Sequence, residues 1–303
     1  MSYENREKIL MIVNPKAGKM AIKSKLLTIV NHFSDQGFEP TVITTQKKLD
    51  ATNIAKELSP RFDRIVCCGG DGTLNEVVTG LMGLPEEARK PLGFIPMGTT
   101  NDLAETFNLP KTALGAAKVI TDGNIVYNDV GSFNKTRYFN YIASCGIFTS
   151  SSYSTPQNVK NSLGHLAYVY EGLKSLNDVK PTFMKVKTEN NTHEGEFIFA
   201  SITNALSVGG IYKFGPNLVN LNDGAFEVLL VRKPKKPSDL FDIFYRLSKL
   251  DYDEKQVVFF HSSKLEIECE DEVKWTVDGE YAGKTDKVFI RNIPNAIRVY
   301  KSK

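Results

Sequence analysis

Three short segments of the sequence combine glycine with hydroxyl, amide or carboxylate side chains, a composition shared by many phosphate sites. They span residues 14–19, 69–76 and 96–102. Glycine lets the backbone approach a phosphate group closely, and free amide N–H groups at the start of a helix bind anions. We therefore expect these three segments to hold the phosphates of a nucleotide.

Two aspartates within these segments, Asp71 and Asp102, indicate a metal ion beside the phosphates. A carboxylate next to a phosphate is repelled by it unless a cation lies between them. Mg²⁺ prefers carboxylate, water and phosphate oxygens as ligands, so a magnesium–nucleotide complex resolves this repulsion. Lys16 and Lys19 would add positive point charges close to the phosphates.

Each segment taken alone also fits a simpler interpretation. A Gly-Gly pair before a helix is often a tight turn, and Asp71 or Thr73 can cap a helix. Three such segments, each following a strand, favour a ligand site over three unrelated turns. The Walker pattern and the complete Rossmann glycine pattern are both absent from the sequence, so the expected nucleotide site is of another kind.

The elements around these segments predict a parallel sheet with crossover helices. Over the first ~130 residues, short apolar runs alternate with amphipathic helical patterns. The three segments follow strands expected at 9–13, 64–68 and 91–95, and a further strand is expected at 41–44. Ligands of open α/β sheets bind beyond the carboxyl ends of the strands, so the three segments should meet at one edge.

Strand-like runs dominate the sequence beyond about residue 125. They lie at 137–144, 196–203, 225–231, 257–260 and 264–269, and helical patterns at 163–173 and 240–247 interrupt them. This pattern predicts a mostly antiparallel second domain, a β-sandwich or similar. We expect domains at 1–128 and 129–291, with residues from about 292 to 303 packing back on the first.

Composition argues against several other classes of protein. The net charge of +3 over 303 residues is too small to indicate nucleic-acid binding, and no apolar run is long enough to span a bilayer. The polar residues 1–8 do not read as a secretory signal. Four cysteines and four histidines show no metal-ligand spacing, which favours reduced thiols in a cytosolic protein.

Taken together, the motifs resemble those of the diacylglycerol-kinase catalytic superfamily, which includes sphingosine and ceramide kinases and, more distantly, NAD kinases and phosphofructokinases. The closest likeness is to the soluble diacylglycerol kinases of Gram-positive bacteria. The matching segments are Asn14-Pro15-x-Ala17-Gly18, Gly69-Gly70-Asp71-Gly72-Thr73-x-Asn75-Glu76-Val77, Pro96-x-Gly98-Thr99-x-Asn101-Asp102, Tyr153-x-Thr155-Pro156, Asn222-Asp223-Gly224 and Asp278-Gly279-Glu280.

The resemblance implies a role for particular residues. Glu280 matches the general base of these enzymes, and Asp71 and Asp102 match the acidic pair of a Mg²⁺-centred network. All three should then converge around a magnesium-bound triphosphate at the mouth of a cleft between the domains. Nucleotide binding carries over to Asn14, Pro15, Lys16, Ala17, Gly18, Thr45, Gly69, Gly70, Asp71, Gly72, Thr73, Leu74, Asn75 and Thr99.

A second, structural Mg²⁺ site is also implied, with the side chain of Asp223 and the backbone carbonyls of Asn220 and Ala225 as ligands. The chemistry of the sequence agrees with the proposed base, because a carboxylate near the attacking hydroxyl can align it and accept its proton. Residues 278–280 follow a strand-like run at 273–277, and glycine there allows a sharp turn. A plain surface hairpin with an acidic end is the alternative.

By the same resemblance, the chain uses ATP and Mg²⁺ to phosphorylate the free hydroxyl of diacylglycerol, giving phosphatidic acid for phospholipid synthesis. It would act as a cytoplasmic, peripheral protein at the inner face of the cell membrane, and homodimers are an expectation from the same family. Lys16, Lys19, Lys23 and Lys160 are candidates for contact with anionic headgroups, against the alternative of a solvated face. Another lipid alcohol (phosphatidylglycerol or a sphingoid base), an NAD kinase and a nucleotide-sensing protein without activity remain as alternatives.

Overall fold

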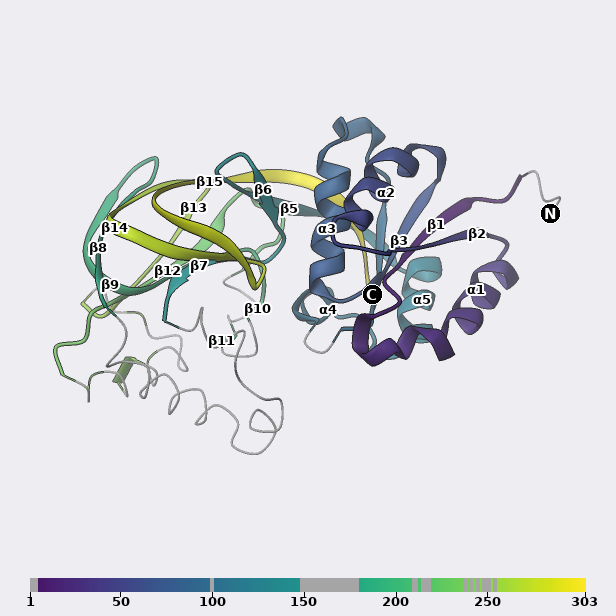
Figure 1. The fold of residues 1–303 in the computed structure, drawn as a ribbon, viewed down its shortest axis with the longest axis horizontal. Helices are drawn as coiled ribbons and strands as arrows, with labels where there is room; N and C mark the ends of the chain where they lie inside the picture. Colours follow the sequence, from purple (N-terminus) through teal and green to yellow (C-terminus); the bar gives the residue numbers. More distant parts are fainter. Residues whose placement is uncertain are drawn as a thin grey trace. The chain divides into compact units, whose positions relative to one another are not determined.

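The computed structural model describes residues 5–98, 101–147, 180–208, 212–213, 219–236, 239, 242–243, 246, 252 and 255–303. The chain divides into two compact units (Figure 1). One consists of Met1–Val130 with Ile293–Lys303, and the other of Gly131–Asn292. The second unit is therefore an insertion within the first, and both chain termini belong to the first.

A parallel sheet forms the centre of the first unit. Its strands are β1 (Lys8–Val13), β2 (Glu39–Thr44), β3 (Arg64–Gly69) and β4 (Leu92–Pro96), in the order β2-β1-β3-β4. The end of β15 (Glu280–Lys301) adds to β4 in parallel, with Val299 opposite Leu92. Five consecutive residues of β1 are buried, as expected for a strand covered on both faces.

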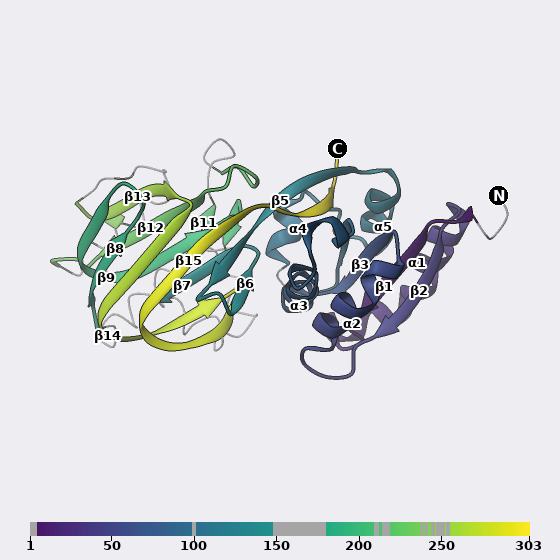
Figure 2. The same ribbon diagram turned by 90° about the horizontal axis from the view of Figure 1, so that it is seen from above.

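Helices cover both faces of this sheet. Helix α1 (Leu26–Asp35) packs against α5 (Ala113–Asp122), and α2 (Asp50–Leu58) against α3 (Asp71–Met82). Figures 1 and 2 show the two pairs on opposite faces of the sheet. The remaining helical elements are short, namely η2 (Ala17–Ser24), η3 (Ser59–Arg61), η4 (Glu86–Ala88) and α4 (Asp102–Thr106).

The second unit is built from antiparallel strands in the order β13-β12-β9-β7-β14-β15. Strand β8 bridges β9 and β14, and β5 pairs with β6 and β15. The bounds are β5 (Asn124–Phe133), β6 (Arg137–Phe139), β7 (Ile142–Gly146), β8 (Thr182–Lys187), β9 (Thr192–Thr203), β10 (Ser207–Val208), β11 (Tyr212–Lys213), β12 (Phe226–Arg232), β13 (Val257–Ser262) and β14 (Lys264–Val277).

The larger apolar core among the described residues of this unit is built around aromatic side chains, and a second apolar cluster lies on the other face of β12. Trp275 is completely buried and contacts Phe133 at 5.6 Å between ring centroids, and Phe139 stacks on Phe226 at 5.3 Å. A parallel α/β domain followed by a mostly antiparallel domain is the fold that the sequence predicts, and the structure confirms it.

The structure corrects the expectation of one strand at 137–144. Two strands, β6 and β7, occupy this stretch and are separated by Asn140 and Tyr141. Their backbone N–H groups donate to a distant carboxylate in place of a neighbouring strand. The helix expected at 163–173 lies outside the described residues, as does most of the one expected at 240–247.

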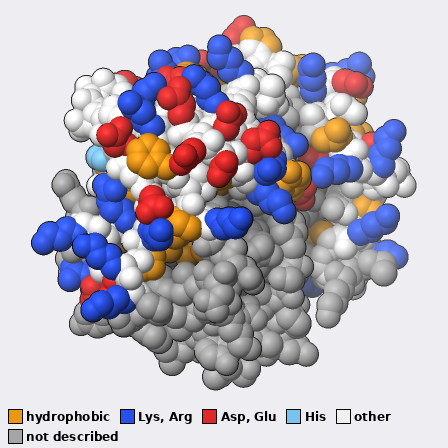
Figure 3. Space-filling model, turned by 60° about the vertical axis from the view of Figure 1, so that its left-hand side comes forward, with side chains coloured by type: hydrophobic (Ala, Val, Ile, Leu, Met, Phe, Trp, Pro, Cys, Tyr) orange, Lys and Arg blue, Asp and Glu red, His pale blue; other side chains and the backbone are white. Residues whose placement is uncertain are grey.

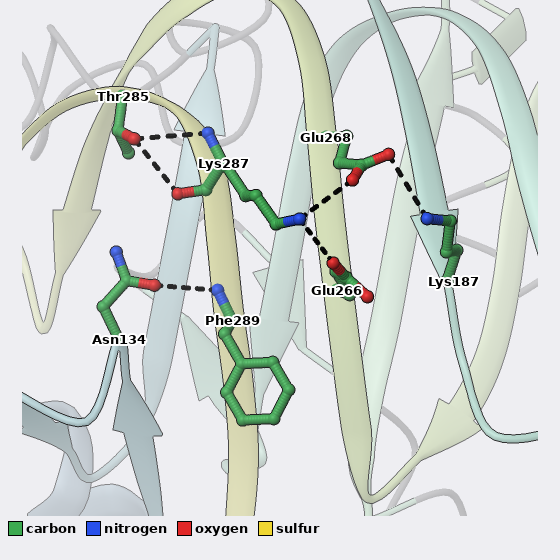
Figure 4. Close-up of polar contacts among 7 residues, drawn as sticks. All are labelled: Asn134, Lys187, Glu266, Glu268, Thr285, Lys287 and Phe289. Carbon is green, nitrogen blue, oxygen red and sulfur yellow. Dashed lines mark hydrogen bonds and ion pairs between the residues drawn. The ribbon is translucent and has the colours of Figure 1, made fainter.

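The face of β8, β14 and β15 opposite the core carries a small network of ion pairs (Figure 4). Lys287 Nζ lies 2.7 Å from Glu266 Oε1 and 3.0 Å from Glu268 Oε1. Lys187 Nζ lies 3.3 Å from the other oxygen of Glu268. On the face that Figure 3 turns forward, acidic and basic side chains are interspersed, which is typical of a solvated surface.

Candidate active site

The loops after β1, β3 and β4 meet at the carboxyl edge of the parallel sheet. Backbone hydrogen bonds connect neighbouring loops, because Asn14 N donates to Cys68 O at 2.9 Å and Met97 N donates to Gly69 O at 2.7 Å. The Asn14 side chain also donates to Thr73 Oγ1 at 3.0 Å. The structure thus brings together the three segments that the sequence singles out.

Two glycines allow the second and third of these loops to touch. A Cβ placed on Gly98 would lie 2.8 Å from the Cα of Gly70 and 2.6 Å from Asn101 Oδ1. Asn101 closes its own loop, since its side chain accepts from Gly98 N at 2.9 Å and donates to Gly98 O at 2.8 Å. Its left-handed backbone (φ 55°) is a conformation that asparagine tolerates. The backbones of Gly70 and Gly98 therefore meet without an intervening side chain.

Asp71 lies at this junction, at the first residue of α3. Burial raises the pKa of its carboxyl above the ordinary value, and backbone N–H groups of Asn101, Asp102 and Leu103 oppose this shift. Its Oδ1 is buried without a hydrogen-bond partner among the described residues. A buried carboxylate oxygen in this state lowers stability unless a ligand completes its coordination.

This arrangement fits a bound magnesium ion. The unpartnered Oδ1 of Asp71 is a hard oxygen donor of the kind that Mg²⁺ takes beside phosphate oxygens. Asp102, the first residue of α4, is 5% exposed, and its backbone N–H is among the groups near the Asp71 carboxyl. The two predicted acidic residues are thus neighbours within the first unit.

The loop after β1 is shaped by the Asn14 side chain and backbone. Lys16 N donates to Asn14 Oδ1 at 3.0 Å, and Ala17 N donates to Asn14 O at 3.2 Å. Gly18 follows with φ 55°, and the Lys16 side chain is exposed. Thr45 directly follows the last residue of β2. Its N–H donates to Val13 O at the end of the adjacent strand β1 at 2.9 Å.

Of the other predicted nucleotide residues, Pro15 lies in the loop after β1, and Gly72, Leu74 and Asn75 lie in the segment after β3. Pro15 and Asn75 are half-buried, Gly72 is exposed, and Leu74 is buried. Thr99 lies outside the described residues.

The predicted base lies in the second unit, on a two-residue hairpin between β14 and β15. Val277 pairs with Glu280, and the residues between them, Asp278 and Gly279, have φ values of 46° and 76°. Positive φ at both central positions is the type I′ turn that Asp-Gly favours. Glu280 is exposed at the start of β15. Its convergence with Asp71 and Asp102 remains a prediction.

Sequence reasoning assigned no separate role to Asp278, the first residue of this turn. Its side chain is 5% exposed and accepts hydrogen bonds from residues 140–142. These residues lie more than 130 positions earlier in the chain, so no local pattern predicts the contact.

The loop predicted to hold a structural metal is held by its own hydrogen bonds. Ala225 N donates to Asp223 Oδ1 at 3.0 Å, and Ala225 O accepts from the Asn292 side chain at 3.1 Å. Asn220 and Asp223 are exposed. No three His, Cys, Asp or Glu side chains in the described part of the chain group closely enough to hold a metal ion, and this prediction invokes a single carboxylate. The site stays a prediction.

A separate cavity of about 370 Å³ in the first unit contains none of the predicted site residues. Its lining includes Glu86, Arg89, Tyr127 and Arg298. Residues 86–89 precede β4, so this cavity lies toward the opposite end of that strand from the three loops. This cavity is therefore separate from the predicted nucleotide site.

Of the lysines considered for membrane contact, Lys16 and Lys23 are exposed. Lys160 and the motif at 153–156 lie outside the described residues. Among the helices that the structure describes, none has the length and apolar character needed to cross a membrane.

Family models match both units of the chain. The diacylglycerol kinase catalytic domain matches residues 8–133, and the YegS C-terminal NAD kinase beta sandwich-like domain matches residues 146–301. A diacylglycerol kinase of Bacillus subtilis (strain 168) is 32% identical over 282 residues, which is 92% of this chain and 92% of that protein. The chain belongs to the diacylglycerol kinase family.

A further relative and a solved structure, both named diacylglycerol kinase, support this family assignment. A diacylglycerol kinase of Staphylococcus aureus (strain JH9) is 33% identical over 299 residues, covering 97% of this chain and 92% of that protein. A crystal structure of a diacylglycerol kinase from Bacillus anthracis str. Sterne superposes with a TM-score of 0.77 at 26% identity and covers 98% of each chain. As a member of this family the chain is a lipid kinase, and kinases take ATP as phosphate donor.

Proposed function

We propose that this chain transfers the γ-phosphoryl group of ATP to the free hydroxyl of diacylglycerol, giving phosphatidic acid and ADP. The observation that carries this proposal is the junction of three loops around the buried, unpartnered Oδ1 of Asp71. We choose diacylglycerol as the substrate because similar proteins are named diacylglycerol kinase. Phosphoryl transfer depends mainly on positioning and on neutralising charge, and the loops offer backbone amides and oxygen donors for both.

In this proposal the loops of the first unit hold the nucleotide. Gly70 and Gly98 let the second and third loops approach each other closely, and Asn14 and Thr73 keep the first two loops together. Asp71 Oδ1 would bind Mg²⁺, which neutralises negative charge on the phosphates when it is bound. Asp102 completes the acidic pair, and Lys16 adds a positive charge at the exposed side.

Glu280 acts as general base in this proposal. Its carboxylate accepts the proton of the lipid hydroxyl as the oxygen–phosphorus bond forms and the bond to ADP breaks. Its exposure on a tight hairpin suits a group that must reach a substrate from outside the protein. We further propose that the enzyme acts as a cytoplasmic, peripheral protein at the inner face of the membrane, and that the loop of Asn220, Asp223 and Ala225 binds a structural Mg²⁺.

Radiolabelled ATP with a panel of lipids tests the substrate. Vesicles would contain diacylglycerol, phosphatidylglycerol or sphingosine, and soluble NAD would serve as a further acceptor. We expect label in phosphatidic acid with the wild-type protein, and a loss of about 10²–10⁴-fold in Glu280→Gln. Glu272→Gln changes an exposed carboxylate on the neighbouring strand β14 and should keep wild-type activity.

Three outcomes would contradict this proposal. Label on another lipid alcohol, or on NAD, would replace the substrate while keeping the kinase. Full activity in Glu280→Gln would remove the assignment of the base. Saturable ATP binding without transfer to any acceptor would favour a nucleotide-sensing protein.

A further inference from the structure

The carboxylate of Asp278 is enclosed by hydrogen-bond donors of a single segment. Its Oδ2 accepts from the backbone N–H of Asn140 at 2.8 Å and from the Asn140 side chain at 3.2 Å. Its Oδ1 accepts from the N–H groups of Tyr141 and Ile142, each at 3.1 Å. The Asp278 N–H in turn donates to Ile142 O at 2.8 Å.

These contacts couple the turn to a strand that is remote in sequence. Asp278 and its partners are 136 to 138 residues apart along the chain. Residues 140–142 lie where β6, which pairs with β5, ends and β7, which pairs with β9 and β14, begins. Four N–H donors converge on this one carboxylate, and hydrogen bonds to a charged acceptor are stronger than those between neutral groups.

The turn itself has little freedom. Asp278 adopts φ 46° and Gly279 φ 76°, so the direction of the chain as it enters Glu280 depends on two residues in the left-handed region. For a non-glycine residue this conformation is unfavourable and needs compensating contacts. The hydrogen bonds to Asp278 supply that compensation, and Glu280 follows two residues later.

The backbone of β15 directly after Glu280 is also fixed by a hydrogen bond from a distant residue. Arg137 Nη1 donates to Tyr281 O at 2.9 Å. The pairing of β14 with β15 shifts by one residue between Trp275–Gly283 and Thr276–Tyr281, which is a β-bulge. Bulges of this kind redirect side chains and are frequent beside active sites. Glu280 thus stands between two fixed backbone segments.

We propose that Asp278 is the positioning residue for Glu280, holding the hairpin so that the Glu280 carboxylate is directed at the lipid hydroxyl. This inference rests on the proposed function of Glu280 as the base. Asp278 itself is buried and saturated with donors, so it touches no substrate. Its contribution reaches the reaction through the geometry of the turn.

A double-mutant cycle separates positioning from general structural support. Asp278→Asn keeps the size of the side chain but places an amide N–H₂ among N–H donors, which breaks part of the network. We expect kcat to fall about 10–100-fold, as with small misplacements of a catalytic group, with the KM for ATP changed less than about 2-fold. In the Glu280→Gln background the same change should alter kcat less than about 3-fold, because the misplaced group is already absent.

Asn140→Ala provides a milder route to the same test if Asp278→Asn does not fold. It removes one of the four donors, and we expect a fall in kcat of about 2–5-fold that also disappears in the Glu280→Gln background. Asp271→Asn is the matched control, because Asp271 is an exposed aspartate on the same strand β14.

The possible results are distinguishable. Equal falls of kcat in the wild-type and Glu280→Gln backgrounds would show that Asp278 acts independently of Glu280 and would overturn the inference. A rise in the KM for ATP without a change in kcat would overturn it too. Full activity of Glu280→Gln would instead remove the base on which the inference rests, and Asp278→Asn could then lower kcat only by another route.

Discussion

The carboxylates at the loop junction and those on the charged face of the second unit have opposite surroundings. At the junction, burial raises the pKa of Asp71, and one of its oxygens has no hydrogen-bond partner among the described residues. On the charged face, hydrogen bonds from Lys287 lower the pKa values of Glu266 and Glu268. The surroundings of Asp71 therefore disfavour its ionised carboxylate, whereas the surroundings of Glu266 and Glu268 favour theirs.

This difference separates a candidate site from a solvated surface. An exposed carboxylate beside a lysine is already neutralised and offers little to a ligand. A buried carboxylate without a cation is costly in the free protein, and that cost is relieved when a metal ion binds. The number of charged residues in a region therefore says less about function than whether each charge is buried and whether it is paired.

The largest effect should follow from Asp71→Asn. This change keeps the shape of the side chain and removes the charge that would bind Mg²⁺, so kinase activity should fall at least about 10²-fold in the radiolabel assay. Glu268→Gln removes a carboxylate that is paired with lysines on the charged face, and it should leave activity unchanged. Loss of activity in both variants, or in neither, would contradict the comparison.

Stability should respond to Asp71→Asn in the opposite sense from activity. Because the folded protein raises the pKa of Asp71, it binds this proton more tightly than the unfolded chain does. Its contribution to stability therefore falls as pH rises from the ordinary value of 3.8 through the raised pKa. At pH 7 with chelator present, Asp71→Asn should show the same Tm as the wild type or a higher one. A lower Tm would show that the ionised carboxylate stabilises the fold.

Gly98→Ala tests the contact between the loops. The new Cβ would meet the backbone of Gly70 at 2.8 Å, so the loops must move apart. We expect the free energy of unfolding to fall by about 1–3 kcal/mol and the affinity for Mg–ATP, followed by calorimetry, to fall about tenfold. The converse change, Gly70→Ala, would meet Gly98 Cα at 3.2 Å and should have the smaller effect. An unchanged affinity in Gly98→Ala would exclude this junction as the nucleotide site.

The smallest effect should follow from Lys287→Met on the charged face. Lys287 lowers the pKa values of Glu266 and Glu268, so its contribution to stability is present above their ordinary value of 4.5 and is lost as pH falls. We expect a decrease in Tm of a few degrees at most at neutral pH and low salt, and none at high salt. Activity should not change. A large, salt-independent decrease would mean that this network supports the fold as strongly as buried groups do.

The sequence predicts the loop junction better than the hairpin, and the reason is physical. The segments at 14–19, 69–76 and 96–102 meet because parallel strands bring their carboxyl ends to one edge, a rule that needs only local patterns. The role of Asp278 depends on N–H groups of residues 140–142, which are paired with it only in the folded chain. The same contact lies where the strand expected at 137–144 divides into β6 and β7, so both differences lie at one place in the fold.

Strand β15 belongs to both units, and this has a consequence for the synthesis of the protein. Its first residue, Glu280, belongs to the second unit, whereas residues 293–301 complete the edge of the parallel sheet beside β4. During synthesis the first unit lacks this edge strand until residues 293–301 have left the ribosome. The inserted unit, whose chain is complete by Asn292, has all its strands available earlier. The unit whose translation begins first is therefore the unit whose strands are completed last.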